Sequence, residues 1–169
     1  AYEEWGLEFA ERLRGMFAVA LWDGRERRLV LARDRFGIKP LYYRDLGGEL
    51  SFASELDALP HGDVDLDALE AFLAFNSVPG PLSIFSDIRK LLPGHTLTWD
   101  GGTIDIQSFA RTGPLPARHG TDEAELVEEC RARLRDSVRA HLIADVPVGV
   151  LLSGGLDARA LAALAAEEP

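Results

Sequence analysis

The 169-residue sequence is short of cysteine, lysine and net positive charge, and each shortage excludes a class of function. Cys130 is the only cysteine, so neither an internal disulfide nor a CxxC zinc site can form. The formal net charge of -10 argues against nucleic acid as a partner, because phosphate contacts need clustered basic residues. No apolar run approaches the roughly 20 residues that a membrane-spanning helix needs. We therefore expect a cytoplasmic protein that binds neither nucleic acid nor membrane.

The apolar residues that are present change their period along the first half of the chain. Trp5, Phe9 and Leu13 recur at every fourth position and predict a helix over residues 2–13. Two hairpins are predicted next, over residues 17–34 and 41–55, because apolar runs flank short polar or glycine-rich turns. We expect these four strands to be neighbours in one antiparallel sheet.

A third hairpin and a linker are predicted further along the chain. Residues 65–76 predict a helix with Asp65 as its N-cap. Residues 95–109 predict a hairpin that turns at Asp100-Gly101-Gly102. Residues 111–120 are rich in Gly, Pro and Arg and poor in apolar residues, which is typical of a linker. The predicted domains are therefore 1–110 and 121–169.

The second predicted domain begins with an amphipathic helix over residues 121–143. Its apolar stripe includes Cys130, so we expect this thiol to be packed in a core and not to act as a nucleophile. The apolar run VPVGVLL, residues 146–152, predicts a buried strand, and a second helix is predicted from Ala158. A strand, a glycine-rich loop and a helix in this order predict the start of a parallel α/β domain.

The loop between that strand and helix, Ser153-Gly154-Gly155-Leu156-Asp157, is the strongest candidate site. Paired glycines let the backbone approach a polyphosphate, and N–H groups at a helix start can point at it. The Ser153 hydroxyl can donate one more hydrogen bond, and the natural partner of Asp157 is a bridging Mg²⁺ ion. The loop lacks the GK[ST] ending of a Walker A motif. The alternative interpretation is a tight structural turn.

Charged residues also crowd the connection Arg33–Pro40, between two predicted strands. One interpretation is a tight interstrand connection in which Asp34 pairs with an arginine. The other is a rim contributed to a nearby ligand site.

Several of these segments resemble a known family. Residues 12–23 (RLRGMFAVALWD), 31–43 (LARDRFGIKPLYY) and 52–59 (FASELDAL) resemble the second half of the class II, N-terminal-nucleophile glutamine amidotransferase domain. Residues 78–97 (VPGPLSIFSDIRKLLPGHTL) resemble the connection that follows it in bacterial asparagine synthetases, and 145–158 (DVPVGVLLSGGLDA) resemble the start of their synthetase domain. The chain thus resembles an internal fragment of a glutamine-hydrolysing asparagine synthetase.

The resemblance implies a fold and an activity. The fold is the second half of an α+β antiparallel-sheet amidotransferase domain, followed by the start of an α/β parallel-sheet ATP-pyrophosphatase domain. The activity is that of a ligase of asparagine biosynthesis: ammonia from glutamine would convert aspartate to asparagine through an acyl-adenylate, releasing AMP and pyrophosphate. ATP and Mg²⁺ are the implied cofactors, with aspartate and glutamine as substrates and a homodimer as the state of the full-length protein.

The resemblance also assigns roles to particular residues. Met16 would line the ammonia tunnel, and Leu151 would contact the adenosine part of ATP. The residues Ser153, Gly154, Gly155, Leu156 and Asp157 would hold the pyrophosphate, with Asp157 reaching Mg²⁺. The family's nucleophilic cysteine precedes the aligned segment and its aspartate-binding residues follow it, so we expect this chain alone to be inactive.

One departure from the family pattern leaves alternatives open. The family loop ends SGGLDSS, whereas this chain has Ala158 and Arg159, so one hydroxyl donor to pyrophosphate is lost. Arg159 could restore a contact, or the chain could be a degenerate nucleotide-binding paralogue. A further alternative is a relative of β-lactam synthetases or lasso-peptide cyclases.

Overall fold

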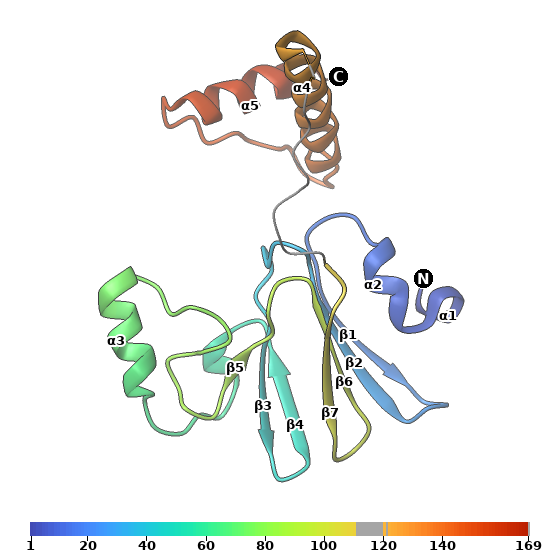
Figure 1. Ribbon diagram of the computed structural model, residues 1–169, viewed down its shortest axis with the longest axis vertical. Coiled ribbons are helices and arrows are strands. Elements are labelled where there is room, and N and C mark those ends of the chain that lie inside the picture. The colour runs from blue at the N-terminus through green and yellow to red at the C-terminus, as the bar shows by residue number, and fades with distance from the viewer. Residues whose placement is uncertain (111–119, 121, 169) are drawn as a thin grey trace. The chain divides into compact units, whose positions relative to one another are not determined.

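The computed structural model describes residues 1–110, 120 and 122–168 (Figure 1). The chain divides into two compact units, Ala1–Gly113 and Pro114–Pro169, called here the N-terminal and C-terminal units. The predicted linker lies outside the described residues except for Gly120, so the predicted domain boundaries stay a prediction. None of the described helices combines the length and the apolar character needed to cross a membrane.

The N-terminal helical segment is interrupted, so the prediction of one helix over 2–13 is only partly right. It consists of α1 (Tyr2–Trp5), a 3₁₀ turn (Gly6–Glu8) and α2 (Phe9–Arg12). Gly6 has a φ of 56°, a left-handed conformation that breaks the helix and that glycine adopts without a steric penalty. The break lets Phe9 pack edge-on against Tyr2, with ring centroids 5.7 Å apart.

Both early hairpins are confirmed. The first joins β1 (Ala18–Asp23) to β2 (Arg28–Arg33), and the second joins β3 (Tyr42–Leu46) to β4 (Glu49–Ala53). In the second hairpin, Gly47 and Gly48 form the two-residue turn with φ angles of 61° and 91°. Positive φ at both central positions is the geometry that a tight hairpin turn requires.

The four early strands do not form one sheet, and that prediction is wrong. One sheet has the order β1-β2-β6-β7, with β6 at His95–Trp99 and β7 at Ile104–Ser108. The other has the order β4-β3-β5, with β5 at Arg89–Lys90. The reason is that β2 pairs with β6, the first strand of the third hairpin, and not with β3. The third hairpin itself is confirmed.

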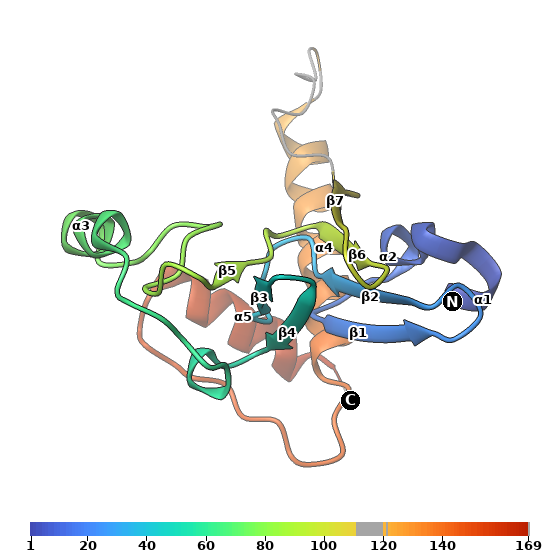
Figure 2. The same ribbon diagram turned by 90° about the horizontal axis from the view of Figure 1, so that it is seen from below.

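The core of the N-terminal unit lies on both faces of β2, whose side chains alternate between them. Val30 and Ala32 pack with Phe9 and Ala10 of α2, which lies beside this sheet in Figures 1 and 2. Leu31 faces the other way, into a buried cluster formed with Leu41, Leu91 and Leu97. Each fully buried leucine stabilises the fold by about 1.5–3 kcal/mol. The strand β2 therefore anchors both clusters.

The helix α3 (Leu66–Phe75) is confirmed together with its cap. The Asp65 carboxylate accepts hydrogen bonds from the N–H groups of Asp67 and Ala68, at 3.0 and 3.2 Å. The helix ends at Asn76, which has a φ of 54°. Both views show α3 standing apart from the two sheets (Figures 1 and 2). A short 3₁₀ turn, Leu56–Ala58, precedes it.

The C-terminal unit consists of α4 (Glu123–His141) and α5 (Leu156–Ala166). Both predicted helices are confirmed, although α5 begins two residues before the predicted start. Ion pairs join the C-terminal half of α4 to the residues that follow α5: Arg135 with Glu167, and Arg139 with Glu168, each at 2.7 Å.

Two predictions for the C-terminal unit are wrong. Cys130 is exposed and not packed in a core. Residues 146–152 form no strand, and Val146 and Leu151 are 70% and 95% exposed. A strand exists only when a neighbour completes its hydrogen bonds, and no described residue pairs with this run. The predicted parallel sheet is therefore not confirmed.

Candidate functional site

The predicted phosphate loop connects the exposed run 146–152 to α5. Gly154 has a φ of 83°, which favours glycine, and Gly155 is the N-cap of α5. The Gly155 N–H lies 3.5 Å from the Ser153 hydroxyl oxygen, at the limit of a hydrogen bond. The loop thus turns at Gly154, whereas Gly155 has an extended conformation that any residue can adopt.

The start of α5 leaves backbone donors free. No side chain of the described residues caps this helix. The N–H of Arg159 makes the first intrahelical bond, 3.2 Å from the Gly155 carbonyl oxygen, so the N–H groups of Leu156, Asp157 and Ala158 precede the hydrogen-bonded ladder. Together with the helix dipole, such donors favour an anion at this end. The geometry is compatible with phosphate binding.

The predicted ATP-binding residues, Leu151 and Ser153 to Asp157, are exposed. Leu151 and Leu156 extend into solvent, and Asp157 is exposed in the first turn of α5. An acidic residue in a first helical turn also stabilises the helix dipole, so Asp157 has a structural interpretation as well. Met16 lies in the N-terminal unit, just before β1, and is 43% exposed. Its predicted role in a tunnel stays a prediction.

The connection after β2 is a tight loop whose backbone N–H groups surround the Asp34 carboxylate. This carboxylate is fully buried and accepts four backbone hydrogen bonds of 3.0–3.3 Å, from Phe17, Phe36, Ile38 and Lys39. The predicted pairing of Asp34 with an arginine is therefore wrong, because backbone donors compensate its charge.

Arg33 closes the same connection from the other side. Its guanidinium donates to the carbonyl oxygens of Gly37, Lys39 and Leu91, at 2.8, 2.8 and 2.6 Å. Burial lowers the pKa of Arg33, and the charge of Asp34 partly opposes that effect. The side chains of Asp34 and Arg33 are thus both hydrogen-bonded to backbone groups of this connection. This favours the interpretation as a tight interstrand connection.

Burial and hydrogen bonding shift the pKa of Asp34 in opposite directions. Burial raises the pKa of the carboxyl, but hydrogen bonds from the N–H groups of Lys39, Ile38, Phe36 and Phe17 lower it, and the net shift is downward. Asp34 is consequently ionised at neutral pH.

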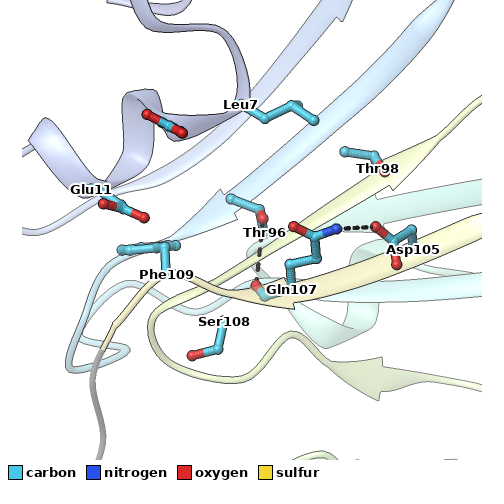
Figure 3. Close-up of a pocket in the computed structure, with 9 residues that line it drawn as sticks. Leu7, Glu11, Thr96, Thr98, Asp105, Gln107, Ser108 and Phe109 are labelled. Atoms are coloured by element: carbon cyan, nitrogen blue, oxygen red, sulfur yellow. Dashed lines mark hydrogen bonds between the residues drawn. The ribbon is translucent and has the colours of Figure 1, made fainter.

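A small cavity of about 90 Å³ lies between the N-terminal helical segment and the strands β6 and β7 (Figure 3). Its wall includes three acidic residues: Glu8, Glu11 and Asp105. Gln107 Nε2 donates to Asp105 Oδ2 at 2.7 Å, and the Thr96 hydroxyl donates to the Gln107 carbonyl oxygen at 3.4 Å. The described residues form no group of three or more metal-ligating side chains, and no predicted site residue lines this cavity. Its acidic wall disfavours phosphate.

Sequence reasoning missed a larger pocket around Lys90. This pocket, of about 400 Å³, lies in the N-terminal unit next to α3 and β5. The only signal in the sequence is that Lys90, one of two lysines, stands with Arg89 between the apolar residues Ile88 and Leu91.

Comparisons with known proteins match both halves of the chain. The glutamine amidotransferase domain family matches residues 1–110, and the asparagine synthase family matches residues 129–169. The glutamine-hydrolysing asparagine synthetase 1 of Bacillus subtilis is 37% identical over 171 residues, covering 98% of this chain and 27% of that protein. A putative glutamine-hydrolysing asparagine synthetase of Mycobacterium bovis is 40% identical over 176 residues, covering 97% of this chain and 27% of that protein.

A relative with a different name is similar to a comparable extent. The amidase chyE of Penicillium rubens is 33% identical over 183 residues, covering 98% of this chain and 25% of that protein. The chain spans about a quarter of the length of these curated relatives.

Proposed function

The chain belongs to the glutamine amidotransferase domain family and continues into the asparagine synthase family, and we propose that it works as part of a glutamine-hydrolysing asparagine synthetase. In this function the side-chain carboxylate of aspartate attacks the α-phosphorus of ATP, and pyrophosphate leaves. Ammonia released from glutamine then attacks the acyl carbon of the adenylate, and AMP leaves. The products are asparagine, AMP and pyrophosphate.

The observation that carries the proposal is the order of two matches on one chain. An amidotransferase match alone is compatible with many acceptors of ammonia, and a glycine loop at a helix start is compatible with many phosphate ligands. Here the amidotransferase match ends at residue 110 and the asparagine synthase match covers the loop and α5. Supplying ammonia and activating a carboxylate are the two halves of one amide-forming reaction.

The residues of the loop have separate roles in the proposal. The unpaired N–H groups at the start of α5 and the Ser153 hydroxyl bind the pyrophosphate oxygens of ATP. Leu151 packs against the adenosine part, and the exposed side chain of Leu151 is free to do so. The Asp157 carboxylate is a hard oxygen ligand and is solvent-accessible, which fits Mg²⁺. Bound Mg²⁺ would neutralise charge on the pyrophosphate leaving group.

Met16 belongs to the other half of the proposal. We assign it to the wall of the path along which ammonia travels, in line with the family pattern around residues 12–23. Its partly exposed thioether is uncharged, so it would not hold a neutral ammonia molecule in place.

The departure from the family pattern at Ala158 and Arg159 allows the proposed role of the loop to be tested. In a chimera, residues 1–169 replace the matching segment of the Bacillus subtilis relative, and pyrophosphate release is measured with ATP, Mg²⁺, aspartate and glutamine. Ala158→Ser should restore a hydroxyl donor and strengthen ATP binding or pyrophosphate release by about ten- to a hundred-fold, the effect of one hydrogen bond to a charged group. Asp157→Asn should reduce Mg²⁺-dependent turnover without unfolding the protein. If neither Ala158→Ser nor Arg159→Ala changes ATP binding or turnover, this loop is not the pyrophosphate site.

A second candidate function rests on the same departure. Ala158 and Arg159 stand where the family pattern has two serines, which favours a degenerate paralogue that binds a nucleotide without turning it over. The chimera separates the two functions, because the paralogue would bind ATP with Mg²⁺ and release no pyrophosphate. The similarity to an enzyme named as an amidase leaves the acceptor open, so the chimera should also be supplied with other carboxylates in place of aspartate.

A further inference from the structure

The pocket around Lys90 lies in the N-terminal unit and shares no residue with the predicted ATP loop. Its volume of about 400 Å³ falls in the range of pockets that bind small molecules. Most of its wall is apolar, and the side chains that form the apolar part are Leu56, Leu69, Phe72, Val78 and Ile84. Leu69 and Phe72 come from α3 and remain partly exposed, so an apolar surface is available there.

Lys90 places a positive charge against this apolar wall. Its ammonium group is half-buried and donates to the carbonyl oxygen of Val78. No carboxylate of the described residues pairs with Lys90, and the residues that line the pocket include no acid. An ammonium group has three donors, so Lys90 retains capacity for an anionic acceptor.

A second cation increases the local positive charge. Burial lowers the pKa of Lys90, and the positive charge of Arg33 lowers it further. Arg33 does not line the pocket, and its guanidinium donates to three backbone carbonyl oxygens, so Lys90 is the cation that a ligand in the pocket would contact. Asp34 already compensates part of the charge of Arg33, whereas no carboxylate of the described residues pairs with Lys90.

From this arrangement we propose that the pocket binds a small organic carboxylate with an apolar body. The carboxylate accepts a hydrogen bond from Lys90 Nζ, and the apolar body lies against Leu69 and Phe72. Charge complementarity selects the anionic head, and the exposed apolar surface of α3 selects the body. The hydroxyl groups of Tyr42 and Ser77, which also line the pocket, can donate to the second carboxylate oxygen.

The test uses decanoate as the probe and decanol as its uncharged counterpart, both below the concentration at which they aggregate. Binding to the chain is measured by isothermal titration calorimetry. The chain contains a matched control, because Lys39 is its only other lysine and has an exposed side chain. Decanoate should bind the unmodified chain and Lys39→Met equally, and about tenfold more tightly than decanol, the effect of one charge-assisted hydrogen bond. Lys90→Met should lose this preference for decanoate.

Further variants keep the test decisive. Lys90→Arg retains a cation and should retain the preference for decanoate, whereas Phe72→Ala should weaken decanoate and decanol alike. Should Lys90→Met fail to fold, as judged by tryptophan fluorescence, the comparison of decanoate with decanol on the unmodified chain decides. Absence of decanoate binding, equal binding of the two probes, or an unchanged preference in folded Lys90→Met would each overturn the proposal. None of these results bears on the ATP loop.

Discussion

The two units of this chain contain similar fractions of apolar residues but bury them very differently. The buried apolar side chains of the described residues lie in the N-terminal unit with the single exception of Val138. In the C-terminal unit the run 146–152 is exposed along its whole length. The comparison shows which structures form from local interactions and which need a partner segment.

Local interactions account for the C-terminal helices. Acidic residues lie in the first turn of α4, and Arg139 and His141 lie in its last turn, as the helix dipole favours. Pairs one turn apart on the exposed surface, Glu128 with Arg131 and Glu129 with Arg133, add to its stability. Such interactions need no other element. A buried strand does need neighbouring elements. Residues 146–152 have the composition of a buried strand, but no described residue pairs with them.

The strongest test of this comparison replaces two valines, each within an apolar run, by aspartate. Val30 lies at 0% exposure in β2, whereas Val148 lies in the exposed run. Val30→Asp buries an unpaired carboxylate and should cost at least about 3–5 kcal/mol, enough to unfold the N-terminal unit. Val148→Asp should change stability by no more than about 0.5 kcal/mol.

Tryptophan fluorescence measures the first effect selectively, because Trp5, Trp22 and Trp99 all belong to the N-terminal unit. Circular dichroism reports the helices of Val148→Asp. If Val148→Asp were as damaging as Val30→Asp, residues 146–152 would be buried in solution and the contrast between the units would fail.

The second prediction concerns the buried charge at Asp34. In Asp34→Asn, an NH₂ group replaces one carboxylate oxygen and would face the N–H groups of Phe17 and Lys39, which have no other acceptor. Two unsatisfied buried donors cost about 2–6 kcal/mol in total. Denaturant unfolding followed by tryptophan fluorescence gives the change. Asp105→Asn is the control, since Asp105 is exposed and bonded only to Gln107, and it should leave the midpoint nearly unchanged.

The third prediction follows from the pKa of the same group. The pKa of Asp34 is lower in the folded chain than its ordinary value of about 3.9, so the folded state holds its proton less tightly than the unfolded state. The stabilisation is therefore complete above about pH 4 and decreases as the pH falls through the lower, folded-state pKa.

Asp87 adds to this acid sensitivity in the same direction. The Gly62 N–H lowers the pKa of Asp87, and Arg44 lowers it as well through hydrogen bonds to the carboxylate. Unfolding midpoints between pH 6 and pH 2 measure the loss, which should be smaller in Asp34→Asn. A midpoint that is independent of pH over this range would contradict the assignment of Asp34 as the buried anion.

The features that sequence reasoning predicted correctly are those fixed by neighbouring residues. The Gly47-Gly48 turn sets its hairpin, and Asp65 sets the start of α3 by accepting two local N–H groups. The turn at Gly154 was likewise predictable, because its positive φ is a conformation that favours glycine.

The features that were missed depend on residues far apart in the sequence. The pairing of β2 with β6 joins residues more than sixty positions apart, and no turn residues in the sequence predict it. The acceptors of Arg33 include Leu91, and the donors to Asp34 include Phe17, so neither network is visible as a motif. The Lys90 pocket is assembled from β3, α3, β5 and the loops between them, which explains why its composition does not appear in any one segment.

The last prediction is the smallest effect and concerns Cys130, the only thiol of the chain. Since Cys130 is exposed on α4, a thiol reagent should react with it at nearly the same rate in buffer and in denaturant. Val138→Cys in a Cys130→Ser background is the matched comparison, because Val138 lies on the same helix and is buried. That thiol should react slowly until denaturant is added. A large acceleration of Cys130 by denaturant would mean that the apolar stripe of α4 is covered in solution, which would extend a buried core into the C-terminal unit and remove the difference between the two halves of the chain.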